Sequence, residues 1–266
     1  MKKNIRTLVF VLAFSAILAV VPLILPTGVS MNILTSSKEG TELLVNPTLA
    51  NNCSDWHFGA WRFLDSTWVS ECNWTFGDGK VSMEMAAEDQ SFYCTMIEQP
   101  YHNQPIYDLQ NEYVVTWRGS MNSGKAQTVG ALGMGVNFFL DAIKDGEAVE
   151  TLELYIFFFQ DGFYTIPVES FKDYGYRGSY WFEELVQEPS EETWRYFYYH
   201  PIQLEFGKTR EITFSLNRCL EVVRLNAGSV YEGADSFRLT RVMSVMELIY
   251  AEGSFTTEYV SLKEVN

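Results

Sequence analysis

The chain has 266 residues, of which 47% are hydrophobic and 15% aromatic, and its formal net charge is −15. This length and apolar content suffice for one sizeable core and favour a single domain over two small ones. The negative charge repels phosphate backbones and anionic lipid headgroups, which excludes nucleic acid and an anionic membrane surface as expected partners. A polysaccharide or surface glycan suits such a surface, because carboxylates accept hydrogen bonds from sugar hydroxyls.

The first thirty residues have the layout of a secretory signal peptide. Lys2, Lys3 and Arg6 precede an apolar run over residues 8–25, and residues 28–30 supply small side chains for cleavage before Met31. An uncleaved membrane anchor is the alternative, because the run is at the short end of a spanning helix. We expect a secreted or cell-surface protein, with a flexible tether at residues 31–40 and one domain at residues 41–266.

Export changes how the four cysteines are interpreted. An even number of cysteines in an oxidising compartment predicts disulfides, and we favour Cys53–Cys72 and Cys94–Cys219. Free buried thiols are the alternative. Export also makes Asn52 and Asn73 candidate glycosylation sites, since both begin an Asn-X-Ser/Thr sequon.

The domain begins with four tryptophans within nineteen residues. They are separated by Asn, Asp and Ser, and they exceed what a small sandwich core needs. We expect at least one to be exposed in a loop, where its indole face could stack on a sugar ring. The candidates are Trp56, Trp61, Trp68 and Trp74.

The next segments read as strands, because hydrophobic residues alternate with polar ones. The predicted strands cover residues 80–86, 91–98, 113–118 and 129–140. The last is interrupted by glycines, which indicates curvature or close backbone approach.

Residues 149–160 form the central predicted strand. Leu152, Leu154 and Ile156 occupy one face, and Glu153 and Tyr155 occupy the other. An aromatic face with one carboxylate is typical of the floor of a sugar-binding groove. The alternative is a strand buried on both faces, with Glu153 at the edge.

Residues 170–192 show no clear periodicity and are rich in aromatic side chains. A long segment of this kind is usually functional or disordered, and the aromatic content argues against disorder. Tyr174, Tyr176, Tyr180 and Trp181 are therefore candidate ligand-binding residues. A flap that closes one end of the sandwich is the alternative.

The remaining chain predicts strands at residues 193–200, 202–206, 212–216, 237–250 and 256–265, and a short helix at 217–226 capped by Asn217. The fold class is therefore all-β. The pattern indicates a jelly-roll β-sandwich of about ten to twelve antiparallel strands.

Two regions resemble carbohydrate-binding modules of the galactose-binding jelly-roll type. The opening residues 43–47 with Asp55-Trp56, the segments 80–86, 92–99 and 110–117, and the closing residues 257–265 carry the resemblance. That family often holds a structural calcium ion. Here only Glu258 approximates one of its acidic positions, so the resemblance implies no firm cofactor.

A second resemblance is to compact, concanavalin-like jelly-roll endoglucanases. Residues 152–158 (LELYIFF) followed by Asp161-Gly162 are similar to the nucleophile strand of those enzymes, and Glu247 falls near their acid/base position. The resemblance implies that Glu153 would be the nucleophile and Glu247 the proton donor. Retaining chemistry would require the two carboxyl groups to lie about 5–5.5 Å apart.

Three functions are therefore open. The leading hypothesis is a secreted, non-catalytic glycan-binding protein. The second is a self-assembling surface or filament subunit that pairs through exposed β-edges. The third is a retaining β-glucanase-like glycoside hydrolase that uses Glu153 and Glu247.

Overall fold

The computed structural model describes residues 39–62, 67–77, 79–87, 93–100, 106–108, 111–162, 179–187, 192–200, 204–220 and 234–265. The predicted signal segment and most of the predicted tether lie outside these ranges, so secretion and assembly through the tether stay predictions. Among the described residues, no helix combines the length and apolar character needed to cross a membrane.

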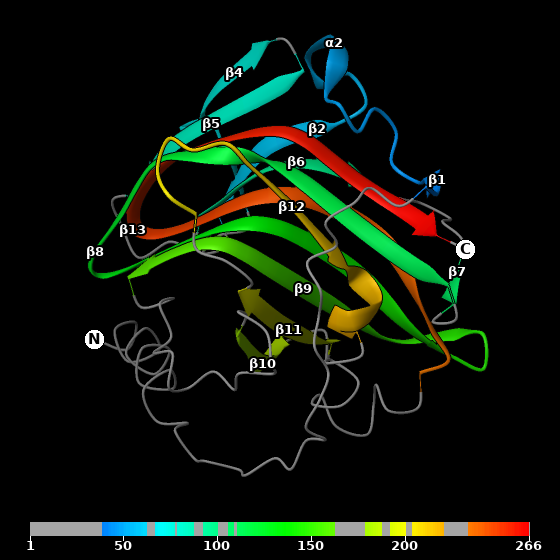
Figure 1. Ribbon diagram of the computed structural model, residues 1–266. Helices are drawn as coiled ribbons and strands as arrows, with labels where there is room; N and C mark the ends of the chain where they lie inside the picture. The colour runs from blue at the N-terminus through cyan, green and yellow to red at the C-terminus, as the bar shows by residue number, and fades with distance from the viewer. Residues whose placement is uncertain are drawn as a thin grey trace, which may run out of the picture.

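Two long, bent strands organise the molecule. Strand β8 (Glu112–Lys144) and strand β13 (Ser236–Val265) pair antiparallel from Glu112 opposite Val265 to Ile143 opposite Ser236. Both strands bend near their middle, so each contributes one half to each of two layers (Figure 1). The sequence predicted two separate strands in each case. Each is one continuous strand because the pairing between β8 and β13 continues on both sides of the bend.

The two layers are named sheet A and sheet B. Sheet A contains β4 (Asn73–Gly77), β5 (Lys80–Ala87), the second half of β13, the first half of β8 and β12 (Arg210–Ser215), and β1 (Thr41–Glu42) pairs with the end of β13. Sheet B runs in the order β10 (Ser179–Gln187), β11 (Glu192–His200), β9 (Glu147–Gly162), β8, β13, β6 (Tyr93–Pro100), β2 (His57–Arg62) and β3 (Thr67–Val69). Strand β7 (Ile106–Asp108) pairs with the beginning of β13.

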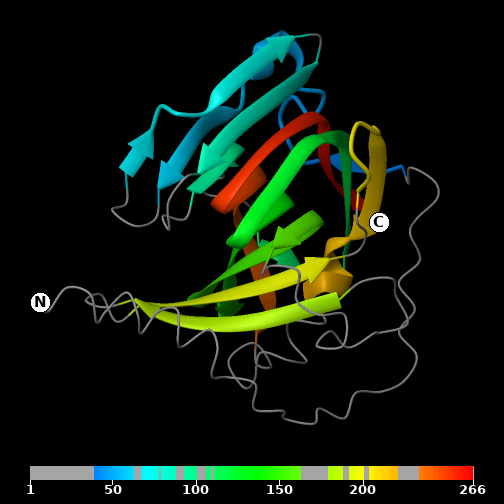
Figure 2. The ribbon, with the colours of Figure 1, turned by 90° about the vertical axis from the view of Figure 1, so that its left-hand side faces the viewer.

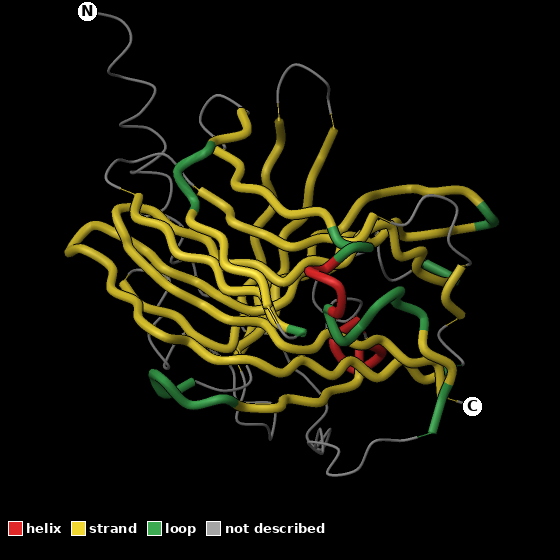
Figure 3. The backbone as a smooth tube through the Cα atoms, turned by 90° about the horizontal axis from the view of Figure 1, so that it is seen from above, coloured by secondary structure: helices red, strands yellow, loops and turns green. Residues whose placement is uncertain are grey.

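The arrangement confirms the predicted all-β jelly-roll sandwich. Strands β10 and β11 lie side by side on the side of the molecule away from β4 and β5 (Figure 2). Most neighbouring strands are antiparallel, and the pair β11–β9 is parallel. Within the described residues, helix is confined to α2 (Ala50–Cys53) and residues 216–220 (Figure 3).

Glycine makes the bend of the β8–β13 pair possible. A Cβ atom on Gly130 would collide with the backbone oxygens of Ile249 and Tyr250, so only glycine allows the strands to approach this closely. Tyr250 itself has a φ of 43°, which is rare for a residue with a side chain. The backbone N–H of Ala126 donates to Asp161 Oδ2 at 2.9 Å and fastens β9 to the same corner.

The hydrophobic core lies between the two sheets. The Trp117 ring from sheet A contacts Phe158 from sheet B at a centroid distance of 4.8 Å, and it also stacks near Phe255. Trp117 Nε1 donates to Ser244 Oγ at 3.3 Å, and Ser244 shares a hydrogen bond with Thr257 at 2.8 Å. The buried polar groups of these three residues are thus hydrogen-bonded to one another, which offsets the cost of their desolvation.

Three local predictions are wrong. Residues 204–206 lie in a loop instead of a strand, and residues 179–187, predicted to lack regular structure, form β10. The helix begins at Leu216, and the backbone N–H of Arg218 donates to Ser215 Oγ, so Ser215 caps it. Asn217 instead joins the helix to the start of β8, because it accepts from the Tyr113 N–H and donates to the Asn111 carbonyl.

The predicted disulfides are also wrong. Cys53, Cys72 and Cys219 are free and buried, so neither Cys53–Cys72 nor Cys94–Cys219 forms. Each thiol has an environment that suits a neutral S–H group. Burial raises the pKa of Cys53 to about 11 and that of Cys219 to about 12, and Cys53 Sγ donates to the Leu49 carbonyl.

Alkylation should confirm the free thiols. Without any reductant, iodoacetamide is expected to modify Cys53, Cys72 and Cys219 in denaturant and to leave them largely unmodified in the folded protein, because buried neutral thiols react slowly. Peptide mass spectrometry reports each site. Recovery of any of the three in a disulfide-linked peptide would contradict the structure.

The core contact between the sheets should dominate stability. Phe158→Ala is expected to lower the free energy of unfolding by about 3–5 kcal/mol, because it removes a fully buried ring. Phe206→Ala is the matched control, since Phe206 is 52% exposed and its loss should cost below about 1 kcal/mol. Urea unfolding of both variants measures the difference. Equal losses would contradict this placement of the core.

Candidate active site

Glu153 and Glu247 lie on the same face of sheet B, the distal face, which is turned away from sheet A. On β9, Leu152, Leu154 and Ile156 belong to the core between the sheets, so Glu153 points the other way. On β13, Met246 and Leu248 belong to that core, which places Glu247 on the distal face too. The strand between them is β8, so the two carboxyl groups come from strands that flank a common neighbour.

Strand β8 supplies a direct partner to Glu153. Asn137 Nδ2 donates a hydrogen bond to Glu153 Oε1 at 2.5 Å. Asn137 is the register partner of Tyr155, which follows Glu153 on the same face of β9. A donor fixed in this way stabilises the ionised carboxylate and restricts its orientation.

Glu247 has a different environment. Its register partner on β8 is Gly133, and a Cβ atom on Gly133 would lie 2.7 Å from Phe157 Cζ. The Phe157 ring therefore lies over Gly133, next to Glu247, and places an apolar wall against that carboxyl group. Neither carboxyl oxygen of Glu247 makes a hydrogen bond of good geometry within the described residues, although the Tyr155 hydroxyl lies near enough to lower its pKa, and Asn137 Oδ1 has no partner there.

The two carboxyl groups differ in how strongly the proton is held. Burial raises the pKa of Glu153 to about 7, and the hydrogen bonds from Tyr155 and Asn137 and the charge of Arg241 oppose that rise. Burial and then the negative charge of Glu153 raise the pKa of Glu247 well above the usual range of a glutamate, and Tyr155 opposes this only in part. Near neutral pH, Glu153 is therefore the group that ionises and Glu247 the group that keeps its proton.

In this structure β9 is buried on both faces from Leu152 to Gln160, which matches the alternative to an open groove above Glu153. The exposed fraction is 3% for Glu153 and 0% for Glu247. Tyr155 is buried as well, so it offers no free ring face to a sugar. Buried acceptors without a partner need an explanation, and an enclosed water or a bound hydroxyl group is the usual one.

The four tryptophans divide as the sequence suggested. Trp56 is buried and donates from Nε1 to the Asn46 carbonyl at 3.1 Å, and Trp74 is half-buried against Phe76. Trp68 is 60% exposed, which confirms that one indole is exposed, but it lies on strand β3 and not in the expected loop. Its ring meets Trp61 at a centroid distance of 5.1 Å.

Trp61 and Trp68 are aligned with Glu247 across sheet B. Trp61 is the register partner of Trp68 on β3 and of Cys94 on β6, and Cys94 is the partner of Glu247. Trp61 packs against Met243 and Val245, which lie on the distal face with Glu247. The two indoles therefore lie in the same cross-strand row as Glu247, and the row ends at the edge strand β3.

The other predicted sites are not joined to this one by any described contact. Tyr174 and Tyr176 lie outside the described residues. Tyr180 and Trp181 lie on β10, where the backbone alone is described. The exposed side chains of Asn52 and Asn73 leave glycosylation there a prediction.

Glu258, the candidate calcium ligand, forms an ion pair with Arg118 at 2.9 Å on sheet A. The described part of the chain contains no group of three His, Cys, Asp or Glu side chains arranged to hold a metal ion.

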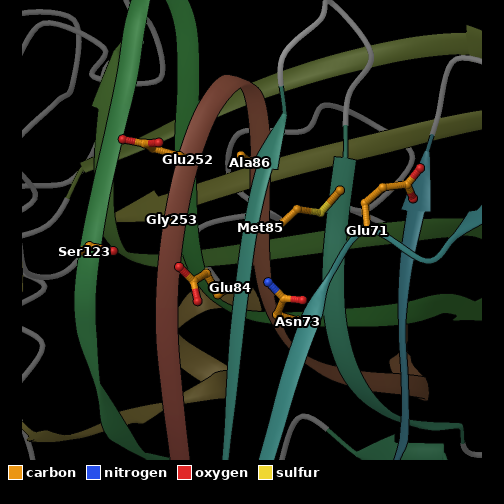
Figure 4. Close-up of a pocket in the computed structure, with 8 residues that line it drawn as sticks. All are labelled: Glu71, Asn73, Glu84, Met85, Ala86, Ser123, Glu252 and Gly253. Carbon is orange, nitrogen blue, oxygen red and sulfur yellow. The ribbon is translucent and has the colours of Figure 1, made fainter.

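A separate cavity of about 400 Å³ lies where β5 meets the bend of the β8–β13 pair (Figure 4). Three carboxylates line it, from Glu71, Glu84 and Glu252, together with Asn73 and Ser123. None of the carboxyl pair or its partners borders this cavity, so it is not the entrance to the candidate site.

Sequence reasoning missed three residues of the site. Asn137 is an amide within the apolar run of residues 129–140, and that isolated polar residue was a usable signal. Arg241 and Phe139 gave no such signal. They join the site only because β8 and β13 are paired in this register.

No family model and no curated protein matches this chain. Among solved structures, it is similar to the family 11 xylanase from Neocallimastix patriciarum, with a TM-score of 0.55 and 12% identity, over 85% of this chain and 95% of that one. It is also similar to a mutant of ENZbleach xylanase, with a TM-score of 0.51 and 12% identity, over 85% of this chain and 83% of that one. The resemblance to carbohydrate-binding modules finds no support in these matches, whereas the fold is that of jelly-roll glycoside hydrolases.

Proposed function

We propose that the protein is a glycoside hydrolase that cleaves a polysaccharide with Glu153 and Glu247. The observation that carries the proposal is the carboxyl pair on the distal face of sheet B, with one group poised to ionise and the other to stay protonated. Two carboxyl groups in unlike environments are what acid/base cleavage of a glycosidic bond requires. The similarity to xylanase folds supports the same conclusion at the level of architecture.

The environments assign the two roles. Glu153, stabilised as a carboxylate by Asn137 and Tyr155, attacks the anomeric carbon and forms a covalent glycosyl ester. Glu247 gives its proton to the departing glycosidic oxygen in the same step. In the second step Glu247 takes a proton from water, the hydroxide adds to the anomeric carbon, and the Glu153 carboxylate is released.

The substrate class follows from charge and from the indole pair. The net charge of −15 disfavours polyanions, so a neutral β-linked polysaccharide such as xylan or glucan is proposed. The Trp61 and Trp68 rings offer a stacking surface in line with Glu247, on which sugar rings could lie with their C–H faces against the indoles.

Turnover requires access to the pair. Because both carboxyl groups are buried in this structure, a sugar can reach them only after the distal face of sheet B opens around them. The protonated carboxyl group of Glu247 would then donate to the glycosidic oxygen and accept from water or substrate hydroxyl groups.

Non-catalytic glycan binding is the second candidate, and the exposed Trp68 favours it. The two functions share the indole surface and differ in whether bonds are broken. Binding of xylan or β-glucan without any release of reducing ends would support this second function.

Removal of either carboxyl group should abolish turnover. Glu153→Gln and Glu247→Gln are each expected to lower the release of reducing ends from xylan or β-glucan by about 10³-fold, within the range expected for loss of a catalytic acid or base. Glu211→Gln, an exposed position on β12, is the matched control and should keep full activity. A wild-type protein that cleaves neither polymer, or variants that cleave as fast as the wild type, would refute the proposal.

Stability should fall as the pH rises, because the folded protein holds a proton that the unfolded chain releases. The pKa of Glu153 is raised from 4.5 to about 7, so its contribution is fully present below pH 4.5 and is lost as the pH rises through 7. That loss amounts to roughly 3 kcal/mol.

Urea unfolding at a series of pH values measures this effect. The difference in unfolding free energy between wild type and Glu153→Gln should change in favour of the variant between pH 4.5 and pH 8. Glu211→Gln, at an exposed position, is the control for the substitution itself. A flat Glu153→Gln difference would mean that this carboxyl group is not buried as the structure places it.

A further inference from the structure

Arg241 lies in one row with Glu153 across the distal face of sheet B. Its register partner on β8 is Phe139, and the partner of Phe139 on β9 is Glu153. Two strand spacings separate Arg241 from Glu153, roughly 10 Å between their Cα atoms. An extended arginine side chain can cover most of that span.

The guanidinium group is held in the middle of this row. Its Cζ atom lies 5.1 Å from the centroid of the Phe139 ring, a cation–π contact. Phe139 and Arg241 both stay partly buried, so the contact is not exposed to full solvent screening. The Phe139 ring therefore serves as a platform that directs the positive charge over β8 toward Glu153.

The groups that face Glu153 differ by strand. Tyr155 on its own strand and Asn137 on β8 are neutral hydrogen-bond donors to Glu153. Glu247 on β13 is the second carboxyl group of the pair. On β11, where the backbone alone is described, the register partner of Glu153 is Tyr196. Arg241 acts on Glu153 as a cation and opposes the effect of burial.

We propose that Arg241 is a positioning residue for Glu153, and that its guanidinium, carried on the Phe139 ring, favours the ionised form of this carboxyl group and sets the lower pH limit of the site. This role rests on the proposed function for its catalytic meaning. The ionisation itself does not depend on turnover, because the three residues are in place in the substrate-free protein.

The test follows the Glu153 carboxyl carbon by NMR in protein labelled with ¹³C at glutamate, with Glu153→Gln used to assign the signal. In Arg241→Met the titration midpoint of Glu153 should move to higher pH by about one unit, a tenfold change, because an opposite charge is removed. In Arg241→Lys, which keeps the charge, the midpoint should stay close to that of the wild type. Phe139→Leu should move the midpoint in the same direction as Arg241→Met, but less.

Arg118→Met is the control, because Arg118 pairs with Glu258 on sheet A and should leave the midpoint unchanged. An unchanged midpoint in Arg241→Met, or an equal shift in Arg118→Met, would overturn the inference. If Arg241→Met does not fold, Arg241→Lys and Phe139→Leu decide: a Phe139→Leu midpoint equal to the wild type would overturn it as well.

The outcome is separable from the proposed hydrolase function. A shifted midpoint in a protein that cleaves no polysaccharide would support the role of Arg241 and refute the hydrolase. In a protein that does cleave, the acidic limb of the kcat/KM profile should move by the same amount as the NMR midpoint.

Discussion

The pairing of β8 with β13 is the constraint on which the rest of the structure depends. Because one antiparallel ribbon passes through both sheets, its bend decides how the sheets face each other and where the core lies. Gly130 permits that bend, since any side chain there would collide with the backbone of β13. The same ribbon carries Asn137, Phe139, Arg241 and Glu247, so the candidate site is a direct product of its register.

Burying two carboxyl groups this close together is electrostatically unfavourable in a protein interior. Two glutamates lie within the range at which one raises the pKa of the other, and burial disfavours the charge on both. Asn137, Tyr155 and Arg241 relieve this for Glu153, whereas Phe157 adds to the burial around Glu247. The arrangement separates two chemically identical side chains into an ionised and a protonated form. A purely structural sandwich has no need for that separation, and apolar side chains could fill the same space at lower cost.

Several features could be predicted from the sequence, for physical reasons. Alternation at residues 149–160 placed Leu152 in the core and Glu153 on the opposite face, because a strand directs successive side chains to opposite sides. The excess of tryptophan between residues 56 and 74 predicted an exposed indole, and Trp68 is that residue. The disulfide pairing could not be predicted from the sequence, since the number of cysteines and the cellular compartment do not determine which thiols lie within bonding distance. Strand β10 was missed because its residues do not alternate.

The sequence by itself determined the all-β class and the position of the central strand with Glu153, because these depend on local periodicity and residue type. Glu247 was indicated only by the resemblance to jelly-roll endoglucanases. Only the tertiary structure decided that Glu153 and Glu247 share a face, that both are enclosed, and that Asn137 and Arg241 act on the first of them. Those relations depend on the register between β9, β8 and β13. Register is a property of paired backbone over long separations in sequence, and no single strand carries it.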